Sequence, residues 1–414
     1  MAASRQKFPV WICSQIGARE HYAIPRALQQ AGRSVTLCTD FWAGRMLRKS
    51  FVGPLRPLGA RCHPGFETIS TATIKSWNVR ALFWEKHLRN IAARQTPYHG
   101  FIKIGRRFAQ CVRGELKRRL EANRDFIFFA YDTGALEALE WCRERDVKCI
   151  LNQMDPNRVE VELVRAEEKQ WPGWALQPVQ VPEEYFARRE REWKAADRVV
   201  VNSEFSRQAL LRQRVPAEKL IVIPLCYEPD GINRPAAINH RQPDKPLRVL
   251  FLGQVILRKG IQYLLAAARQ LERENIHFDV VGTIGISQTA LATAPRNVTF
   301  HGRAVRDQAA SWYRRSHVFV LPTLSDGFAI TQLEAMAHGL PVIVTDCCGK
   351  VVGDGVDGFL IPARDASALA QTLRRFLAEP DLLTKQSAAA LIKASQFTLD
   401  RLAVDLMRLE SGLL

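Results

Sequence analysis

One stretch in the last third of the chain decides its fold class and reads SDGFAITQLEAMAHGLP, residues 325–341. The apolar run 317–321 before it predicts a buried strand, and residues 331–337 suit a short helix. Gly339 and Pro341 end that helix before a second apolar run, residues 342–344. The stretch thus joins two predicted strands through a loop and a helix, which is typical of an α/β fold.

Two carboxylates in this stretch stand eight positions apart, Asp326 in the loop and Glu334 about one turn into the helix. The start of a helix has unpaired N–H groups and a partial positive charge, so it binds phosphate oxygens. We expect the amides of Phe328, Ala329 and Ile330 to hold the diphosphate of a nucleotide sugar. The carboxylates would then accept hydrogen bonds from hydroxyls on either side of the diphosphate, Asp326 from the sugar and Glu334 from the ribose. The alternative is a solvated loop aspartate and a surface glutamate on a helix.

The same stretch resembles the Glu-x7-Glu region of the family 4 retaining glycosyltransferases. It keeps the residues that carry this resemblance, namely Gly327, Phe328, Glu334, Ala335, Met336, Ala337, Gly339, Pro341 and Val342. It departs at Asp326, where the family has Glu, and at Ala329, where the family has Gly. The resemblance implies the GT-B fold, in which two doubly wound Rossmann-like domains face each other across a cleft. It also implies a nucleotide-sugar donor bound mainly by the second domain.

A second match lies at residues 253–260, after the predicted strand 247–252. The family pattern there is Gly-Arg-Leu, three residues and Lys-Gly, with both basic residues on the diphosphate. Lys259 matches, whereas Gln254 stands in place of the Arg and Arg258 precedes the Lys. An Arg fork and a Lys point charge both suit phosphate oxygens. We therefore predict that Gly253, Gln254, Arg258 and Lys259 bind the donor, and that Arg258, Lys259 and Asp326 are the catalytic residues.

The first half of the chain opens with a strand, residues 8–13, a loop that contains Gly17, and a helix over residues 21–31. Ligands of doubly wound sheets lie beyond the carboxyl ends of the strands, so this loop is a candidate wall of the cleft. The resemblance implies that Gly17 lies at the donor site. Arg19, Glu20 and His21 follow in the same loop. They are predicted either to contact the acceptor or to cap the helix. The loop lacks Gly-x-Gly-x-x-Gly, so a dinucleotide fingerprint is not supported.

The predicted elements and the resemblance together give a domain plan. Residues 1–228 form the acceptor-side domain, 229–246 a proline-rich linker, 247–394 the donor domain and 395–414 a helix that crosses back to the first domain. Residues 167–174 are predicted to form a loop near the cleft. Many family members carry a donor-contacting His near residues 152–156, and this chain has none there.

Composition limits the class of protein. Hydrophobic residues make up 47% and charged residues 24%, which is ordinary for a soluble globular protein, and no run of 18 apolar residues occurs. Nine cysteines without any Cys-x-x-Cys pair predict neither a disulfide framework nor a zinc site, and indicate a reducing cytoplasm. No Asp-x-Asp motif is present, so we expect catalysis without a metal or other cofactor.

The net charge of +17 is concentrated at one end of the chain. Residues 1–125 contain 23 Lys and Arg against 7 Asp and Glu, and residues 103–120 read as an amphipathic basic helix. We expect an anionic partner, either a membrane leaflet or a phosphate-bearing lipid-linked acceptor. A solvated basic face is the alternative. No RNA- or DNA-binding module is recognisable, so nucleic acid is not expected as a partner.

The resemblance thus implies a retaining, hexosyltransferase-type enzyme that moves a sugar from a nucleotide sugar to an unidentified acceptor. In that family the leaving phosphate takes the proton of the acceptor, so no protein base is required. The alternative is a non-catalytic relative that binds a nucleotide sugar or a membrane surface, because Gln254, Asp326 and the absent His depart from the family pattern. The expected location is cytoplasmic, at or near the inner face of a membrane.

Overall fold

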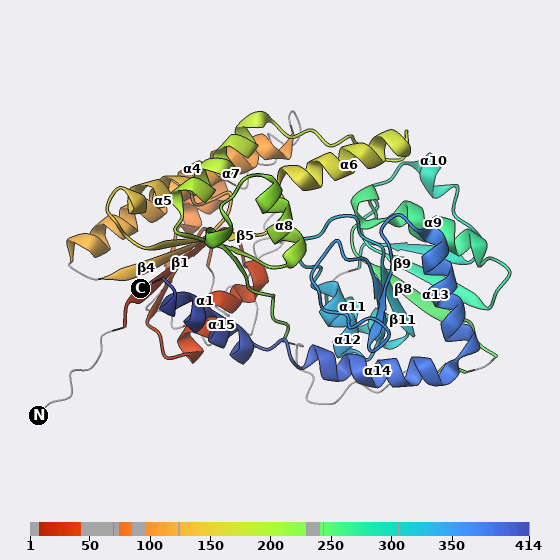
Figure 1. Cartoon of the computed structure of the whole chain (residues 1–414). Coiled ribbons are helices and arrows are strands. Elements are labelled where there is room, and N and C mark those ends of the chain that lie inside the picture. The colour runs from red at the N-terminus through yellow and green to blue at the C-terminus, as the bar shows by residue number, and fades with distance from the viewer. Residues whose placement is uncertain are drawn as a thin grey trace, which may run out of the picture.

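The computed structural model describes residues 8–42, 69, 74–84, 96–122, 125–228, 241–242, 244–304 and 306–413. These residues form two halves, each a parallel sheet with helices on both faces (Figure 1). The predicted fold class, two doubly wound α/β domains, is confirmed. The predicted linker, residues 229–246, lies mostly outside the described residues, as do large parts of the basic region between residues 43 and 95.

The first sheet has the strand order β3-β2-β1-β4-β5-β6-β7, all parallel in the described part. Four of its central strands are buried along nearly their whole length, as expected for strands covered on both faces. The strands are β1 (Val10–Gln15), β2 (Val35–Thr39), β3 (Ile74–Ser76), β4 (Phe126–Tyr131), β5 (Cys149–Gln153), β6 (Arg198–Val201) and β7 (Leu220–Val222).

Helices cover both faces of this sheet and bury a separate apolar cluster on each. One cluster includes Phe108, Leu139 and Trp193, and the other includes Trp11 and Leu28. The helices of the first half are η1 (Arg19–Tyr22), α1 (Ala23–Gln30), α4 (Pro97–Glu121), α5 (Leu136–Arg143), α6 (Arg158–Gln170), α7 (Glu183–Ala195), α8 (Glu204–Arg212) and η6 (Ala217–Lys219).

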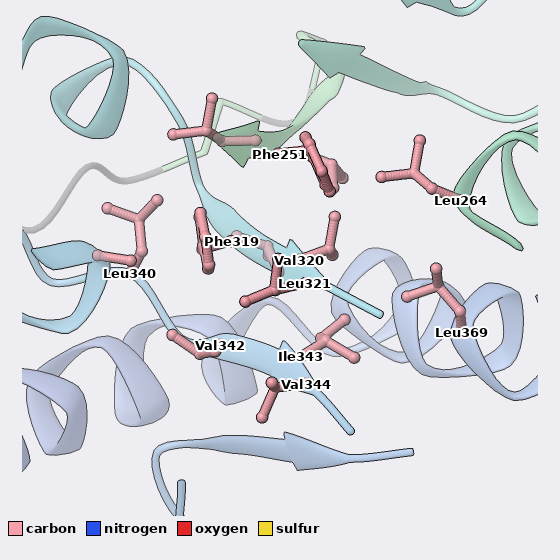
Figure 2. Close-up of a cluster of buried hydrophobic side chains, with 14 of the residues drawn as sticks. Phe251, Leu264, Phe319, Val320, Leu321, Leu340, Val342, Ile343, Val344 and Leu369 are labelled. Carbon is pink, nitrogen blue, oxygen red and sulfur yellow. The ribbon is translucent and has the colours of Figure 1, made fainter. Parts of the chain in front are cut away.

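The second sheet has the order β10-β9-β8-β11-β12-β13. Its core includes the apolar runs on either side of residues 325–341, such as Phe319–Leu321 and Val342–Val344 (Figure 2). The strands are β8 (Leu247–Leu252), β9 (Ile276–Val281), β10 (Val298–Gly302), β11 (Val318–Leu321), β12 (Val342–Val344) and β13 (Gly358–Leu360). The helices are η7 (Leu257–Lys259), α9 (Ile261–Gln270), α10 (Gln288–Leu291), α11 (Arg306–Arg314), α12 (Thr331–Ala337), α13 (Ala366–Ala378) and α14 (Pro380–Ala394).

The last helix, α15 (Leu399–Ser411), leaves the second half and packs beside α1 on the first (Figure 1). Its Glu410 accepts hydrogen bonds from Trp11 Nε1 at 2.7 Å and from Arg33 Nη2 at 2.7 Å. The side chain of Glu410 is only 5% exposed. A buried carboxylate with two such donors ties the end of the chain to its first strand.

α6 behaves differently from the other helices of the first half. It extends from the end of β5 toward the second half, and the residues after it hydrogen-bond there, with Leu176 N donating to Gly285 O at 3.1 Å (Figure 1). The prediction of a loop over residues 167–174 is therefore wrong at its start, because α6 continues to Gln170. Strong helix formers such as Glu167, Glu168 and Lys169 explain why the helix continues.

Candidate functional site

Two loops at the carboxyl ends of β8 and β11 form the centre of the candidate site. Gly260, after η7, lies so close to the end of β11 that a Cβ added to it would stand 1.8 Å from Pro322 O. The main chains are also joined directly, since Leu324 N donates to Arg258 O at 2.9 Å. β8 and β11 are neighbours in a parallel sheet, so their loops meet at one edge. The structure thereby brings Arg258, Lys259 and Asp326 together.

Lys259 and Asp326 form an ion pair in which the ammonium donates to the carboxylate. Both side chains are largely buried, at 14% and 15% exposed. Burial by itself raises the pKa of Asp326, but Lys259 and Arg258 outweigh it and hold that pKa below its ordinary value. Asp326 is therefore ionised at neutral pH. The ammonium of its partner Lys259 could also form an ion pair with a phosphate oxygen.

Arg258 lies between the two halves of the molecule. Its Nη1 donates to Ser325 O at 2.9 Å and to Glu160 Oε2, on α6, at 3.3 Å. Ser325 Oγ donates to the same Glu160 oxygen at 3.0 Å. Burial raises the pKa of Glu160 to about 7, although the Arg258 charge opposes that shift. Glu160 was missed in the sequence because a carboxylate on a charged surface helix has no distinguishing signal.

The loop before α12 holds the predicted diphosphate amides. Asp326 accepts a hydrogen bond from the backbone of Ala329, so this amide is engaged within the loop. Ala329 has φ +63°, a left-handed conformation that disfavours residues with a Cβ. Glycine adopts this conformation without steric cost, which explains why the family 4 glycosyltransferases have Gly at this position. Phe328 is buried and Ile330 half-buried at the start of α12.

Gly327 is a point of close approach between the halves. A Cβ at this position would lie 2.1 Å from Met154 O and 2.9 Å from Asn202 Nδ2, both in the first half. Glu334, on α12, accepts a hydrogen bond from Tyr313 OH at 2.7 Å. Burial and the Glu334 charge raise the pKa of Tyr313 well above its ordinary value, so its hydroxyl remains a donor.

The other predicted donor residues lie at strand ends. Gly253 N donates to Val281 O at 3.0 Å, and Gln254 is exposed beyond it. Gly17 lies at the carboxyl end of β1 in the first half, with φ +76°, and its amide donates to Asp40 Oδ1 at 2.8 Å. The roles of these residues in binding stay predictions.

Arg19, Glu20 and His21 form the turn η1 before α1. The capping alternative is wrong, because the N-cap residue of α1 is Tyr22 and it makes no capping bond through its side chain. Glu20, His21 and Tyr22 have φ values of 51°, 50° and 57°, a strained run of left-handed residues without glycine. Tyr131 OH donates to Glu20 at 2.8 Å, and burial raises the pKa of Glu20 to about 7. The acceptor role of this turn stays a prediction.

A buried ionic network supports the facing edge of the first sheet. Arg189 is 1% exposed and donates to Asp132 Oδ2 at 2.7 Å and to Asp155 Oδ1 at 3.1 Å. Met154 N also donates to Asp132, at 2.8 Å. These bonds fix the loop that faces Gly327. Sequence reasoning missed them because Arg189 is one of many charges along the helix α7 and nothing in the sequence sets it apart.

Known proteins resemble this chain in sequence over part of its length. Residues 246–379 match the family model described as glycosyl transferases group 1. A D-inositol 3-phosphate glycosyltransferase of Streptomyces bingchenggensis is 31% identical over 239 residues, which are 50% of this chain and 51% of that protein. The corresponding enzyme of Streptomyces coelicolor is 35% identical over 179 residues, 39% of each chain. The chain thus spans about half the length, or less, of these curated relatives.

Solved structures match over nearly the whole chain. Sucrose-phosphate synthase from Thermosynechococcus elongatus superposes with a TM-score of 0.60 at 17% identity, covering 98% of this chain and 99% of that one. Anabaena HepE in complex with UDP-glucose gives a TM-score of 0.57 at 14% identity, covering 98% and 100%. At these identities the likeness concerns the fold alone. The second half of the chain thus carries a segment similar to the group 1 glycosyl transferases, and its two sheets are arranged as in these solved structures, which is the GT-B fold.

Proposed function

We propose that this protein transfers a hexose from a nucleotide-sugar donor to an acceptor hydroxyl, as a retaining enzyme of the family 4 type. The observation that carries the proposal is the meeting of Arg258, Lys259 and Asp326 between the two domains. Anabaena HepE, which shares the fold, forms a complex with UDP-glucose, and this supports a nucleotide sugar as donor here. Two preorganised cations are what a departing diphosphate requires.

Each residue then has a role in the transfer. Arg258 and Lys259 bind the diphosphate and stabilise the charge that develops on it as the bond to the sugar breaks. When the donor binds, Lys259 exchanges its ion pair with Asp326 for one with the phosphate. Asp326 then accepts a hydrogen bond from a hydroxyl of the sugar, and Glu334 accepts hydrogen bonds from the hydroxyls of the ribose. The leaving phosphate takes the proton of the acceptor, which attacks on the same face. No metal or further cofactor takes part in this scheme.

The test is turnover of a panel of UDP-, GDP- and ADP-sugars by the purified protein, with and without EDTA. Lys259→Ala and Arg258→Ala are each expected to lower donor turnover on the order of 10²-fold, the loss typical of one preorganised charge contact. Glu162→Gln, an exposed change on α6, is the control. A double variant with the rate of the unmodified protein would contradict the role of the two cations. Loss of activity in EDTA, restored by Mg²⁺, would contradict the metal-free scheme.

Retention predicts that the product keeps the anomeric configuration of the donor, which NMR of the first product formed measures. Glu334→Gln should raise the Kd for the donor more than it changes kcat, because ribose contacts are equal in ground and transition states. Asp326→Asn should mainly lower kcat. Donor binding without any turnover would favour the non-catalytic alternative.

For the partner, we propose that the first domain docks on an anionic membrane. On α4, Lys103, Arg107 and Arg113 are exposed and have no ion-pair partner among the described residues. The neighbouring helical segment 78–84 packs on α4 through Trp84 and Phe108, whose ring centroids lie 6.5 Å apart.

The same segment exposes three apolar side chains, Val79 at 68%, Leu82 at 38% and Phe83 at 70%. Basic groups beside an apolar ridge suit anionic headgroups over acyl chains. A transmembrane anchor is a separate matter: no described helix combines the length and apolarity needed to cross a bilayer.

Sedimentation with vesicles tests this docking. Pelleting is expected with anionic and not with neutral lipid, and about 0.5 M salt should release the protein, because it shortens the Debye length below about 8 Å. Changing Lys103, Arg107 and Arg113 to Glu should abolish pelleting. Lys117→Glu is the weaker control, since Lys117 is paired with Glu121 on the same helix. Equal pelleting with both lipids would contradict the proposal and favour a soluble acceptor.

A further inference from the structure

The candidate site is incomplete without one residue from the opposite domain. Glu160 is contributed by α6 of the first domain, yet its Oε2 lies 3.3 Å from Arg258 Nη1 and 3.0 Å from Ser325 Oγ of the second. The side chains of Arg258 and Glu160 are 20% and 22% exposed. Because Arg258 is proposed to bind the diphosphate, Glu160 lies directly beside the proposed position of two negative charges.

α6 is held firmly in this position. Glu167, two turns beyond Glu160, is fully buried and accepts three hydrogen bonds from the second domain, from Gln262 Nε2 at 2.9 Å, Tyr263 OH at 2.8 Å and Arg364 Nε at 2.5 Å. A backbone bridge joins Ala175 to Ile286 just after α6. Glu160 is thus a fixed part of the site rather than a mobile surface carboxylate.

We propose that Glu160 is a positioning residue of the donor site, which orients the Arg258 guanidinium and takes up one proton when the diphosphate of the donor binds. The inference rests on the proposed function. The proton comes from water or buffer and adds to a carboxylate oxygen of Glu160. No bond of the donor is made or broken in this step.

The charges around Glu160 explain why it takes up a proton readily. Arg258 faces it from η7, Asp326 from the loop before α12, Asp155 from the end of β5 and Tyr98 from the start of α4. Burial and the two neighbouring aspartates raise the pKa of Glu160, whereas the Arg258 charge and the Ser325 hydroxyl lower it. A bound diphosphate adds negative charge and removes part of the Arg258 compensation. Both changes favour the protonated form further.

The affinity for the donor is expected to fall as the pH rises above 7. Below pH 7 Glu160 is already protonated in the free protein, so the donor binds at no protonic cost. Above pH 7 the ionised carboxylate must take up a proton on binding. The Kd is then expected to rise by up to about tenfold for each pH unit, the limit for one linked proton. The diphosphate of a nucleotide sugar lacks a terminal monoester phosphate and does not itself titrate in this range.

Isothermal titration calorimetry of the full chain tests the inference. UDP-, GDP- and ADP-glucose are titrated between about pH 6 and 8.5, in buffers of different ionisation enthalpy, which reports the protons taken up. For the unmodified protein and the control Glu162→Gln, the Kd should rise above pH 7 with uptake approaching one proton. Glu160→Gln should bind with a pH-independent Kd and no uptake, because the amide oxygen still accepts from Arg258. Glu160→Ala should weaken binding about tenfold at pH 6 through loss of that hydrogen bond, and its Kd, like that of Glu160→Gln, should not change with pH.

The outcomes separate the two proposals. If none of the three nucleotide sugars binds, the proposed function fails and this inference fails with it. If one binds with the same pH profile in Glu160→Gln as in the unmodified protein, Glu160 is not the linked group and the inference alone is overturned. If Glu160→Ala binds as tightly as the unmodified protein at pH 6, Glu160 does not position Arg258.

Discussion

For single residues, backbone geometry explains why glycine would suit the position of Ala329. Ala329 has φ +63°, a conformation that costs a residue with a Cβ about 1–2 kcal/mol and costs glycine almost nothing. The position lies in the loop that carries Asp326, whose carboxylate accepts from the Ala329 backbone. The strain is therefore stored next to the proposed catalytic carboxylate, where such strain often occurs.

Ala329→Gly is expected to stabilise the second domain by about 0.5–1 kcal/mol, after the extra entropy of glycine in the unfolded chain is subtracted. Thermal unfolding followed by circular dichroism measures it as a rise in Tm. Ala337→Gly, on helix α12, is the matched control and should lower Tm, because glycine costs about 1 kcal/mol in a helix. A fall in Tm for Ala329→Gly would show that the left-handed conformation is not occupied.

At Gly327, in contrast to Ala329, the absence of a side chain is required, because it allows the two domains to come into contact. In Gly327→Ala the new Cβ would stand 2.1 Å from Met154 O, a backbone atom that cannot move independently. The domains must separate locally, so donor turnover is expected to fall on the order of 10²-fold through misplacement of the reacting groups. Kinetics with the best donor of the panel measures this, and Gly114→Ala, at a position on α4 with open space around it and no left-handed backbone, is the control. Full activity in Gly327→Ala would mean that this approach is not needed for turnover.

Among the elements, α15 belongs by sequence to the end of the chain and by packing to its beginning. Leu402, Leu406 and Leu409 are buried in the same apolar cluster as Trp11 and Leu28. Glu410 adds two directed bonds to that apolar contact. Such burial of leucines contributes several kcal/mol in total, at about 1.5–3 kcal/mol for each side chain.

Glu410→Ala is expected to destabilise the first domain by about 3–5 kcal/mol, because it leaves Arg33 and the Trp11 N–H without their buried acceptor. Denaturant unfolding monitored by tryptophan fluorescence measures the loss. Asp405→Ala on the same helix breaks pairs with Arg401 and Arg408, which are 62% and 68% exposed, and should cost under about 1 kcal/mol. Equal losses in the two variants would mean that burial does not determine the value of these ion pairs.

For the molecule as a whole, polar contacts of α6 contribute to the relative placement of the two domains. Glu167 is fully buried and accepts from three side chains of the second domain. Met154 and Asn202 meet Gly327 at a second point. Each of these contacts can be removed by a single substitution, which makes the domain arrangement accessible to mutation.

Glu167→Ala should therefore separate the domains, because Arg364, Tyr263 and Gln262 lose their shared acceptor. Small-angle X-ray scattering is expected to show a larger radius of gyration than in the unmodified protein, together with weaker donor binding. Glu162→Ala, exposed on the same helix, should change neither. An unchanged radius would show that Glu167 does not hold the domains together.

The two parallel sheets and the core of the candidate site could be predicted from the order of residues alone. Apolar runs such as 247–252, 318–321 and 342–344 have the length and composition of buried strands, and Gly and Pro mark the turns between them. Because ligands of such sheets lie at the carboxyl ends of the strands, Arg258, Lys259 and Asp326 could be assigned to one site from their places after predicted strands together with the resemblance to the family 4 glycosyltransferases.

The residues of the first domain that complete this site could not be found in that way. Glu160 and Arg258 are 98 positions apart, and Glu167 and Arg364 are 197 apart. On a charged helix, a carboxylate that will be buried against another domain has the same local pattern as one that stays in water. The difference arises from the orientation of the two domains, which depends on weak contacts summed over a whole interface and leaves no periodicity in the chain.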